Sequence, residues 1–246
     1  MSDLSGSTTI VVGASRGLGH GIATAFAEAG ASVVAVSRTE AKFAEPANGR
    51  ITAEVADAGE DGVARALIER HRPRTVVLVA GASPHMVPLQ DQTWESFSTN
   101  WESDVRITFH WLRDILLTPL GRGGRVIVIS SGAALNGSPL SGGYAGAKAT
   151  QRFIAGYAQG EAEREGLDIA FTSVHPRFAP MTGVGAPAVA AYAARAGRPV
   201  EEFVKQIGPV LDPEIAGAAV VELARAEVAD LAPGYVLNGA GLKKLP

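Results

Sequence analysis

The chain has 246 residues, of which 46% are hydrophobic and 19% charged, and its formal net charge is -3. This composition excludes a disordered chain, and the charge gives no reason to expect nucleic acid or an anionic membrane as a partner. There is no cysteine, which excludes disulfides, thiol catalysis and cysteine-ligated zinc, and the five histidines show no metal-ligand spacing. The polar N-terminus and the lack of an apolar stretch as long as a membrane span make the cytoplasm the expected location.

Residues 8–39 predict a strand, a glycine-rich turn, a helix and a second strand, which is the order of a βαβ unit. Glycine lets the backbone approach a pyrophosphate closely, and the start of the following helix presents free N–H groups and a positive dipole end to an anion. We therefore expect this turn to bind the phosphates of a dinucleotide. The expected contacts are Gly13, Ser15, Arg16, Gly17, Leu18 and Gly19.

Two other glycine motifs are alternatives for the same turn. Residues 13–17 match Gly-x-Ser-x-Gly, the motif in which a serine is a hydrolase nucleophile. That motif normally needs earlier strands to supply its oxyanion loop, whereas here the turn follows the first strand. The phosphate-binding motif Gly-x4-Gly-Lys-Ser/Thr is absent from the chain. The turn therefore favours dinucleotide binding over hydrolysis.

The rest of the chain alternates between predicted strands and helices. This alternation predicts an α/β fold with a doubly wound parallel sheet flanked by helices, in a single domain over residues 1–246. Ligands in such sheets bind at the carboxyl ends of the strands, where the glycine turn, Gly81, Ser131 and Pro176 are all expected. The predicted strands are residues 50–57, 75–82, 125–131, 168–176 and 234–238, and the predicted helices are residues 61–70, 94–117 and 141–165.

A serine, a tyrosine and a lysine stand at a spacing that suits proton transfer at a carbonyl or alcohol carbon. Tyr144 and Lys148 are four residues apart on a predicted helix, which places both side chains on one face. Ser131 ends an apolar strand thirteen residues before the tyrosine. A neighbouring positive charge favours a phenolate, which makes Tyr144 a candidate proton donor or acceptor near neutral pH. The alternative is a surface tyrosine beside a solvated lysine.

The glycine turn, Ser131, the Tyr144-x3-Lys148 pair and the domain length together resemble the short-chain dehydrogenase/reductase family over essentially the whole chain. The resemblance implies a Rossmann-type sheet, a nicotinamide cofactor and reversible hydride transfer between that cofactor and a carbonyl or alcohol. It also implies that Tyr144 is the acid/base, that Lys148 activates it and holds the nicotinamide ribose, and that Ser131 hydrogen-bonds the substrate oxygen. Further cofactor contacts are expected at Arg38, Glu54, Val55, Ala80, Gly81, Tyr144, Lys148 and Pro176.

The charges near the second predicted strand favour NADP(H) over NAD(H). Where an NAD-preferring member of the family usually has an acid that binds the ribose 2'-hydroxyl, this chain has Ser37 followed by Arg38. Arg16 in the glycine turn is the other cation within reach, and two guanidinium groups suit the extra 2'-phosphate. The alternative for either arginine is a solvated side chain. Glu54 occupies the place of a family aspartate near the adenine and is one methylene longer.

The chain departs from the family pattern after two of its strands. The Asn-Asn-Ala-Gly after the fourth strand reads Leu-Val-Ala-Gly at residues 78–81, so an apolar side chain replaces the amide that normally braces the central strands. The Pro-Gly after the sixth strand reads Pro176-Arg177. We hypothesise that Arg177 meets an anionic group of substrate or cofactor, the alternative being an arginine turned to solvent.

A third departure concerns the helical asparagine of the family's catalytic set. Counting roughly 27 residues back from Ser131 reaches Asp104, while Asn100 lies one turn earlier on the same helix face. The spacing favours Asp104 as a fourth catalytic residue. A carboxylate there would stabilise the Lys148 ammonium and oppose the Tyr144 phenolate, so we expect a pH optimum set by a coupled Asp, Lys and Tyr group.

Residues 178–211 are expected to form a mobile lid over the substrate, as the corresponding region does in the family. The segment is mostly apolar, which indicates a small-molecule carbonyl or alcohol with apolar surface. His85 and His175 follow predicted strands and are candidates for contact with the substrate. The family usually builds dimers or tetramers through the helices that hold Asp104 and Tyr144, so a homodimer or homotetramer is expected.

Two functions stay open on the sequence. The first is an NADPH-dependent carbonyl reductase or alcohol dehydrogenase. The second is an NADP-binding sensor or scaffold without turnover, which the altered asparagines and the Pro176-Arg177 pair suggest. The presence of Ser131, Tyr144 and Lys148 favours the enzyme, because a pure binding protein has no need of Ser131.

Overall fold

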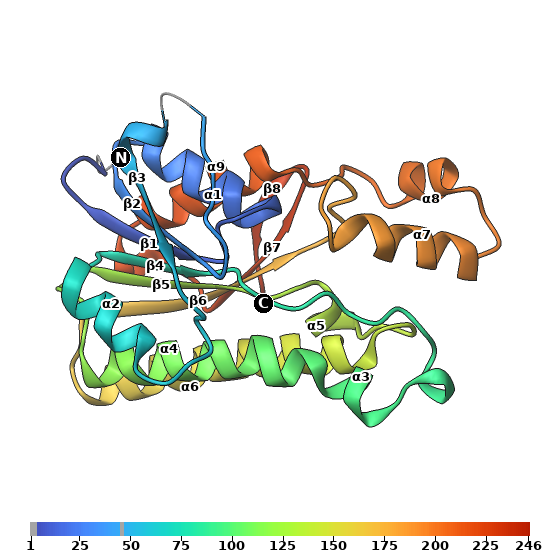
Figure 1. Ribbon diagram of the computed structural model, residues 1–246, viewed down its shortest axis with the longest axis horizontal. Helices are drawn as coiled ribbons and strands as arrows, with labels where there is room; N and C mark the ends of the chain where they lie inside the picture. Colours follow the sequence, from blue (N-terminus) through green and yellow to red (C-terminus); the bar gives the residue numbers. More distant parts are fainter. Residues whose placement is uncertain (1–3, 45–46) are drawn as a thin grey trace.

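One sheet of eight strands forms the centre of the molecule (Figure 1). The computed structural model describes residues 4–44 and 47–246. The strand order is β3-β2-β1-β4-β5-β6-β7-β8, and every neighbouring pair is parallel except β7 and β8. The strands are β1 (Thr8–Val12), β2 (Ser32–Ser37), β3 (Ile51–Val55), β4 (Thr75–Leu78), β5 (Gly124–Ile129), β6 (Ile169–Pro176), β7 (Gly234–Asn238) and β8 (Gly241–Lys244).

Helices cover both faces of this sheet, with α1 and α9 on one face and α2, α4 and α6 on the other (Figure 1). Each face buries its own apolar core, one around Phe26 and Val220 and the other around Trp111 and Leu112. The helices are α1 (Gly17–Glu28), α2 (Val63–His71), α3 (Trp94–Asn100), α4 (Arg106–Leu117), α5 (Ala133–Asn136), α6 (Gly142–Arg164), α7 (Gly185–Arg195), α8 (Val200–Gln206) and α9 (Pro213–Arg225), with a π-helical turn at Trp101–Val105 and short 3₁₀ turns at Ala47–Arg50, Leu89–Asp91 and Val228–Asp230. The chain is thus a Rossmann-type doubly wound α/β domain.

The central strands are apolar along their length because both faces of the sheet are covered. Every residue of β4, β5 and β6 is buried, and β4 and β5 are rich in valine and isoleucine, which fit a pleated, enclosed surface. Leu78, which takes the place of the family's bracing amide, is 2% exposed and packs in the core under α4. The apolar substitution therefore adds to the core at this point.

Two glycines allow α1 and α9 to cross closely. A Cβ on Gly21 would lie 2.3 Å from the Pro213 carbonyl oxygen, and a Cβ on Gly217 would lie 2.7 Å from the Gly21 carbonyl oxygen. A larger residue at either position would push the helices apart. This contact helps to hold α1 on the sheet, with its first turn at the carboxyl end of β1.

The structure confirms the predicted strands and helices, with shorter ends in several cases. The strand predicted at residues 75–82 ends at Leu78, and beyond it the N–H groups of Val79 and Ala80 both donate to the Val12 carbonyl at 2.8 Å. The helix predicted at residues 94–117 is present but contains the π turn. Helix α9 and the antiparallel strand β8 have no counterpart among the sequence-based predictions.

Helices α7 and α8 project from the body of the domain after β6 (Figure 1) and lie within the segment expected to form a lid. The ring of Phe178 packs edge-on against Tyr192 and Phe203, with centroids 5.9 and 5.8 Å away. The Tyr192 hydroxyl also hydrogen-bonds Ser138, in the loop before α6. These contacts join the projecting segment to the sheet end and to α6. In the described part of the chain, no helix combines the length and apolar character needed to cross a membrane.

Candidate active site

A cavity of about 910 Å³ opens at the carboxyl ends of β1, β2, β4, β5 and β6. It lies at the point between β1 and β4 where the strand order reverses, which is where doubly wound sheets bind ligands. Its volume is in the range of small-molecule and cofactor sites. The glycine turn, the start of α6, the π turn and the segment after β6 all contribute to its lining. The fold thus brings the nucleotide-binding and catalytic motifs to one place.

Three glycines shape the turn between β1 and α1. Gly13 has a φ of +96° and Gly17 a φ of +57°, a backbone conformation that side chains with a Cβ rarely adopt. A Cβ on Gly13 would also lie 2.5 Å from the Ala80 amide nitrogen, and a Cβ on Gly19 would lie 2.1 Å from the Gly13 carbonyl oxygen. Glycine is therefore needed both for the path of the backbone and for the packing of α1 against the turn.

The start of α1 is suited to bind an anion. Its N-cap residue, Arg16, makes no side-chain cap hydrogen bond, and the first helical turn contains no acidic residue. The N–H groups that a helix leaves free at this end, together with its dipole, favour a phosphate. Ser15, Arg16, Gly17 and Leu18 line the cavity here. The residues present therefore fit the pyrophosphate of a nicotinamide dinucleotide.

Two arginines flank this phosphate-binding end of the cavity. Arg16 and Arg38 both line it and are both exposed to solvent. Over residues 4–44 and 47–246, neither guanidinium has an ion-pair partner. Glu40 lines the cavity two residues after Arg38 and is a carboxylate that the sequence-based argument for NADP did not include. The end of β2 therefore presents a free cation with an acid close by in the sequence.

The structure does not bring Glu54 or Val55 to the cavity. Glu54 Oε1 lies 3.1 Å from Arg70 Nη1 and 3.1 Å from His71 Nε2, both on α2, and Val55 is 62% exposed. Asp57, which follows β3, lines the cavity instead. The expected cofactor contacts at Glu54 and Val55 are therefore corrected, because the chain reaches the cavity only beyond the end of β3, at Ala56 and Asp57.

Ser131, Tyr144 and Lys148 all line the same cavity. Ser131 follows β5, and its Oγ accepts a hydrogen bond from the Ala133 N–H at 3.2 Å. Tyr144 and Lys148 lie one turn apart near the start of α6, and the Lys148 ammonium nitrogen is 5.5 Å from the centre of the Tyr144 ring. The structure therefore places a hydroxyl, a phenol and a cation around one part of the cavity.

Helix α6 is fixed to its neighbours at the level of these side chains. A Cβ on Gly143 would lie 2.0 Å from the Phe97 carbonyl oxygen, so only glycine permits this approach of α6 to α3. The Ser130 hydroxyl, at the end of β5, donates to the Lys148 carbonyl at 2.7 Å. These contacts set the position of the helix relative to Ser131, and with it the position of Tyr144.

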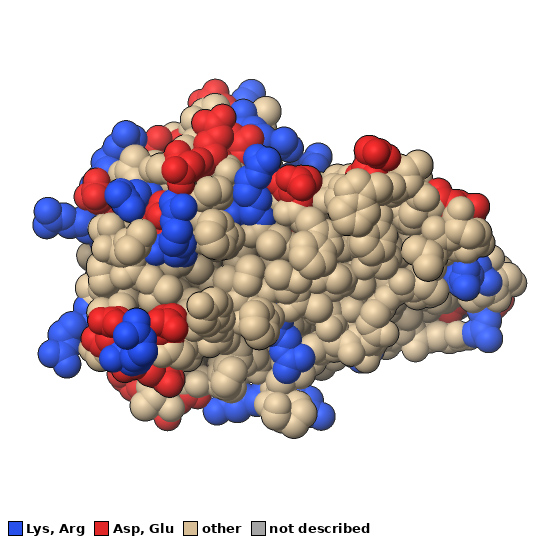
Figure 2. Space-filling view, turned by 90° about the horizontal axis from the view of Figure 1, so that it is seen from below, with Lys and Arg blue, Asp and Glu red and all other residues tan. Residues whose placement is uncertain are grey.

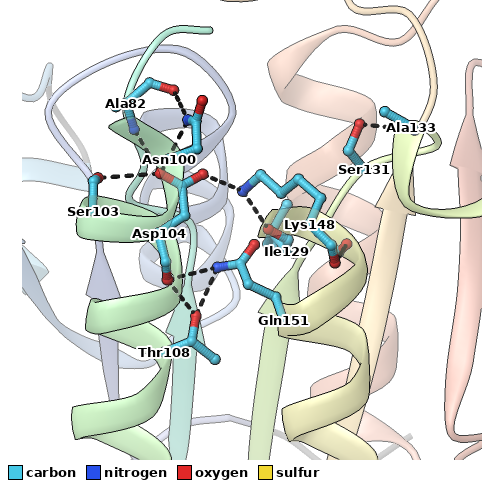
Figure 3. A network of polar contacts seen from close by, with 11 residues as sticks. Ala82, Asn100, Ser103, Asp104, Thr108, Ile129, Ser131, Ala133, Lys148 and Gln151 are labelled. Atoms are coloured by element: carbon cyan, nitrogen blue, oxygen red, sulfur yellow. Dashed lines mark hydrogen bonds and ion pairs between the residues drawn. The ribbon is translucent and has the colours of Figure 1, made fainter. Parts of the chain in front are cut away.

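Asp104 forms a buried ion pair with Lys148 (Figure 3). Its Oδ2 lies 3.1 Å from Lys148 Nζ, with side-chain exposures of 0% and 6%, and Nζ also donates to the Ile129 carbonyl at 3.4 Å. Asp104 belongs to the π turn at Trp101–Val105. A Cβ on Gly81 would lie 2.6 Å from Oδ2, so the carboxylate occupies space that only glycine leaves open.

The second carboxylate oxygen of Asp104 is held by three donors (Figure 3). Oδ1 accepts hydrogen bonds from the Ala82 N–H at 2.8 Å, the Ser103 hydroxyl at 3.1 Å and the Asn100 amide at 3.3 Å. Asn100 is buried, donates also to the Ala82 carbonyl at 2.8 Å, and does not line the cavity. The position beside Lys148 is therefore filled by Asp104, and Asn100 supports it from behind.

The main chain of Asp104 is tied to α4 and α6 as well. Its carbonyl oxygen accepts hydrogen bonds from the Thr108 hydroxyl at 2.8 Å and from the Gln151 amide at 3.1 Å. Gln151 also donates to the Thr108 hydroxyl at 2.6 Å. All three side chains are buried, so this network gives Asp104 one fixed position between the two helices.

The charge of Lys148 is set by two opposing effects. Burial disfavours the ammonium, but the charge interactions with Asp104 and then with Tyr144 favour it, and the pKa of Lys148 is raised above its ordinary value. Lys148 therefore carries a positive charge throughout the neutral pH range. That charge faces both Asp104 and the ring of Tyr144.

The substrate end of the cavity is formed by lining residues within segments 82–86, 131–144 and 176–192. Arg177 is the one charged residue among those that the structure describes there, and Pro176 lines the cavity beside it. The apolar side chains of this end include those of Pro84, Met86, Pro139, Phe178, Val184, Ala188 and Tyr192. A substrate would therefore meet a mostly apolar surface with one cation.

Neither candidate histidine lines the cavity, and the expected substrate contacts at these positions are corrected. His85 is exposed to solvent. His175 is fully buried in β6, where its ring contacts the Ser173 hydroxyl at 3.0 Å and the Ser131 carbonyl at 3.2 Å. Burial lowers the pKa of His175 to about 4, so the ring is uncharged at neutral pH. Its contacts make it a support for the end of β5.

The cavity also contains residues that no motif in the sequence indicated. Thr182 approaches the glycine turn, with its Cβ 3.7 Å from the position of a Cβ on Gly17, so the segment after β6 reaches across the cavity mouth. Tyr192 on α7 presents a second phenol to the substrate end. Only their place in the segment expected to cover the substrate could have pointed to these two side chains.

The sheet order, the glycine turn and the serine, tyrosine and lysine around one cavity define a nucleotide-binding oxidoreductase of the Rossmann type. A sequence model of the family described as short chain dehydrogenase matches residues 7–193, and the chain belongs to this family. Its members include dehydrogenases and reductases, and the fold implies a nicotinamide cofactor.

Individual relatives agree with this assignment. Dehydrogenase/reductase SDR family member 1 of Mus musculus is 28% identical over an alignment of 248 positions, which covers 91% of this chain and 76% of that protein. The 12alpha-hydroxysteroid dehydrogenase of Clostridium sp. is 27% identical over 187 residues, which cover 69% of this chain and 72% of that protein. A crystal structure of a short chain dehydrogenase from Mycobacterium avium matches 100% of this chain and 86% of that chain, with a TM-score of 0.77. Its 20% sequence identity supports the fold alone.

Proposed function

We propose that this protein is an NADP(H)-dependent oxidoreductase that transfers hydride between the nicotinamide and a carbonyl or alcohol substrate, with Tyr144 as the acid/base. The observation that supports this most directly is that Ser131, Tyr144 and Lys148 line the same cavity as the glycine turn. When bound, the nicotinamide supplies or accepts the hydride. The residues of the chain bind the cofactor, orient the substrate oxygen and move the proton.

Proton transfer is assigned to Tyr144 with help from its neighbours. The phenol gives its proton to the substrate oxygen in reduction and takes it back in oxidation. The positive charge of Lys148 lies 5.5 Å from the ring centre, where it would stabilise the negative charge that develops on the phenol oxygen during proton transfer. Ser131 Oγ accepts the Ala133 N–H, which leaves its own O–H free to donate to the substrate oxygen.

Asp104 is proposed as a positioning residue that acts through Lys148. Its carboxylate holds the ammonium at 3.1 Å, so the lysine keeps both its charge and its place beside Tyr144. Because Asp104 raises the pKa of Lys148, we propose that this ion pair contributes to the pH dependence of the activity.

The cofactor is proposed to extend from the glycine turn across the strand ends to Tyr144 and Lys148. The free N–H groups at the start of α1 would hold the pyrophosphate, and Lys148 would hold the nicotinamide ribose. Arg38, with Arg16, would hold the 2'-phosphate, which supports NADP(H) over NAD(H). The proposed cofactor contacts are Gly13, Ser15, Arg16, Gly17, Leu18, Gly19, Arg38, Asp57, Ala80, Gly81, Tyr144, Lys148 and Pro176.

Replacing Arg38 by alanine is expected to raise the dissociation constant for NADPH by roughly 10- to 100-fold, the loss of one charge-assisted pair. Binding of NADH should change little, because NADH lacks the 2'-phosphate. Fluorescence titration of both cofactors measures the difference. Arg65→Ala, which removes an exposed arginine of α2 outside the cavity, is the matched control. Equal weakening of both cofactors, or a wild-type preference for NADH, would rule out the assignment.

The proposed activity is tested by NADPH consumption across a panel of aldehydes and ketones, with NADPH binding measured on the same preparation. We expect tight binding and turnover of at least one carbonyl compound. Tight binding without turnover of any compound would instead support the sensor or scaffold, which the Asp104 and Arg177 departures keep as the second candidate.

We also propose that the protein forms a homodimer or homotetramer through α4 and α6. Figure 2 shows a broad uncharged area on the side of the molecule where these helices lie, with most of the charged residues toward one end and a few at the other end and along one edge. Phe109 on α4 and Phe153 and Tyr157 on α6 are 49%, 72% and 62% exposed. Exposed aromatic side chains gathered on packed helices are typical of a protein interface.

The oligomer is tested by analytical ultracentrifugation. The wild-type chain of 25.4 kDa is expected to sediment as a dimer or tetramer. The double variant Phe153→Glu, Tyr157→Glu should shift toward the monomer, because two carboxylates would be buried at the interface. Leu89→Glu, at a side chain that is 75% exposed outside these helices, should have no such effect. A monomeric wild-type protein would refute the proposal.

A further inference from the structure

Arg177 stands at the substrate end of the cavity on a fixed backbone. Its N–H donates to the Leu237 carbonyl at 2.8 Å, and the carbonyl of the preceding Pro176 accepts the Gly132 N–H at 2.8 Å. The Arg177 Cγ is 3.7 Å from the position of a Cβ on Gly132, so the side chain begins against the residue that follows Ser131. The backbone of Arg177 is therefore fixed to β7 and to the segment after β5, and its side chain starts beside the residue that follows Ser131.

This guanidinium is free to bind an anion. Within the described residues, Arg177 has no ion pair and no side-chain hydrogen bond. Among the other cavity cations, Lys148 and Arg106 are each paired with a carboxylate, at 3.1 and 3.8 Å. Arg16 and Arg38 belong to the phosphate-binding end. Among the described residues, Arg177 is thus the cation of the substrate end that can pair with an anion of a ligand.

The surface around Arg177 selects what kind of anion can bind. The described lining of the substrate end is otherwise uncharged and mostly apolar, with Met86, Phe178 and Val184 among its side chains. An apolar surface of this kind favours a ligand with an apolar body, and a single arginine favours one anionic group on it. The planar guanidinium matches a carboxylate with two parallel hydrogen bonds.

We propose that Arg177 binds a carboxylate of the substrate, so that the preferred substrates are oxo acids or hydroxy acids with an apolar body. This inference rests on the proposed oxidoreductase function and names the substrate class of the same site. The cofactor phosphates have their own partners at the other end of the cavity. Arg177 is therefore a specificity-determining residue that distinguishes carboxylic acids from neutral carbonyl compounds of the same shape.

The test compares phenyl-substituted oxo acids of different ketone-to-carboxylate spacing with their methyl esters. For the best acid, we expect wild-type kcat/KM to exceed that of its ester by roughly 10- to 100-fold, the value of one charge-assisted pair. Arg177→Gly, which restores the family residue, should remove this preference mainly through KM for the acid. Arg177→Lys should retain part of it. Arg195→Gln, at a basic residue of α7 outside the cavity lining, is the control and should retain all of it.

Binding measurements separate this inference from the proposed activity. Calorimetric titration of the corresponding hydroxy acid into the NADP complex needs no turnover, and its affinity should fall in Arg177→Gly while the affinity for NADPH is unchanged. An acid preference that is absent in the wild type, or that persists in Arg177→Gly, overturns the inference. Weaker NADPH binding in Arg177→Gly with an unchanged acid preference also overturns it, because the arginine would then serve the cofactor. Failure to turn over any acid or ester would instead count against the proposed oxidoreductase activity.

Discussion

Tyr144→Phe is expected to lower kcat by about 10²- to 10⁴-fold while the dissociation constant for NADPH changes little. The substitution removes one hydroxyl from a side chain that lines the cavity beside Lys148, and it leaves Ser131 and the glycine turn intact. The proton then has no donor at the substrate oxygen. Steady-state kinetics on the best carbonyl substrate, with fluorescence titration of NADPH, give both quantities.

Tyr157→Phe provides a matched control for this substitution. Tyr157 lies on the same helix, is 62% exposed and does not line the cavity. Removal of its hydroxyl should leave kcat within the error of the wild type. Equal kcat values for Tyr144→Phe and the wild type would show that Tyr144 is not the acid/base.

Asp104→Ala is expected to lower the free energy of unfolding by about 3 to 5 kcal/mol, because it leaves the buried Lys148 ammonium without its counter-ion. The substitution also frees the Ala82 N–H and the Ser103 hydroxyl, which now donate to the carboxylate. Denaturant unfolding followed by circular dichroism measures the loss. Glu102→Ala removes the partner of an exposed ion pair in the same π turn, and should cost less than about 1 kcal/mol. Equal effects of the two substitutions would contradict a special role for the buried pair.

Asp104→Asn tests the electrostatic coupling with a side chain of nearly the same shape. Loss of the negative charge removes an interaction that raises the pKa of Lys148, so the ammonium should lose its proton at a lower pH and the alkaline limb of the pH-rate profile is expected to move to lower pH. An unaltered pH-rate profile would show that Asp104 does not couple to the reaction.

The same ion pair links stability to pH. Because the folded-state pKa of Lys148 is raised above the ordinary value of 10.5, its contribution to stability is complete below that value and is lost as the pH rises through the folded-state pKa. Asp104→Asn should lower the free energy of unfolding. It should also reduce the part of that free energy that is lost as the pH rises.

The sequence alone was sufficient to predict those features of the fold and the site that have a local physical cause. The alternation of apolar runs and helical spacing predicted the doubly wound sheet, because each run had to be buried on both faces. The glycines at 13, 17 and 19 could be recognised because the backbone there has no room for a Cβ or needs a positive φ. The four-residue spacing of Tyr144 and Lys148 predicted that both lie on one helix face, because a helix turns once in 3.6 residues.

The positions of side chains that depend on how distant segments pack together could not be predicted from the sequence. Counting along the chain put the adenine contact at Glu54, whereas the segment after β3 brings Asp57 to the cavity. His175 sits just before the end of β6, and only the packing around that strand shows that its ring points into the protein and contacts Ser173. The π turn that carries Asp104 likewise has no sequence signal, and the three donors to its carboxylate come from the fold.

Hydride transfer with NADP(H) is tested most directly by isotope transfer. Wild-type protein is incubated with the best carbonyl substrate and with NADPH deuterated at the hydride-donating carbon of its nicotinamide ring, and the product alcohol is analysed by mass spectrometry. We expect deuterium on the carbinol carbon of the product from the wild type, and at least about 100-fold less from Tyr144→Phe in the same time. Tight NADPH binding with no deuterium in any product alcohol would contradict the oxidoreductase and leave a cofactor-binding protein in its place.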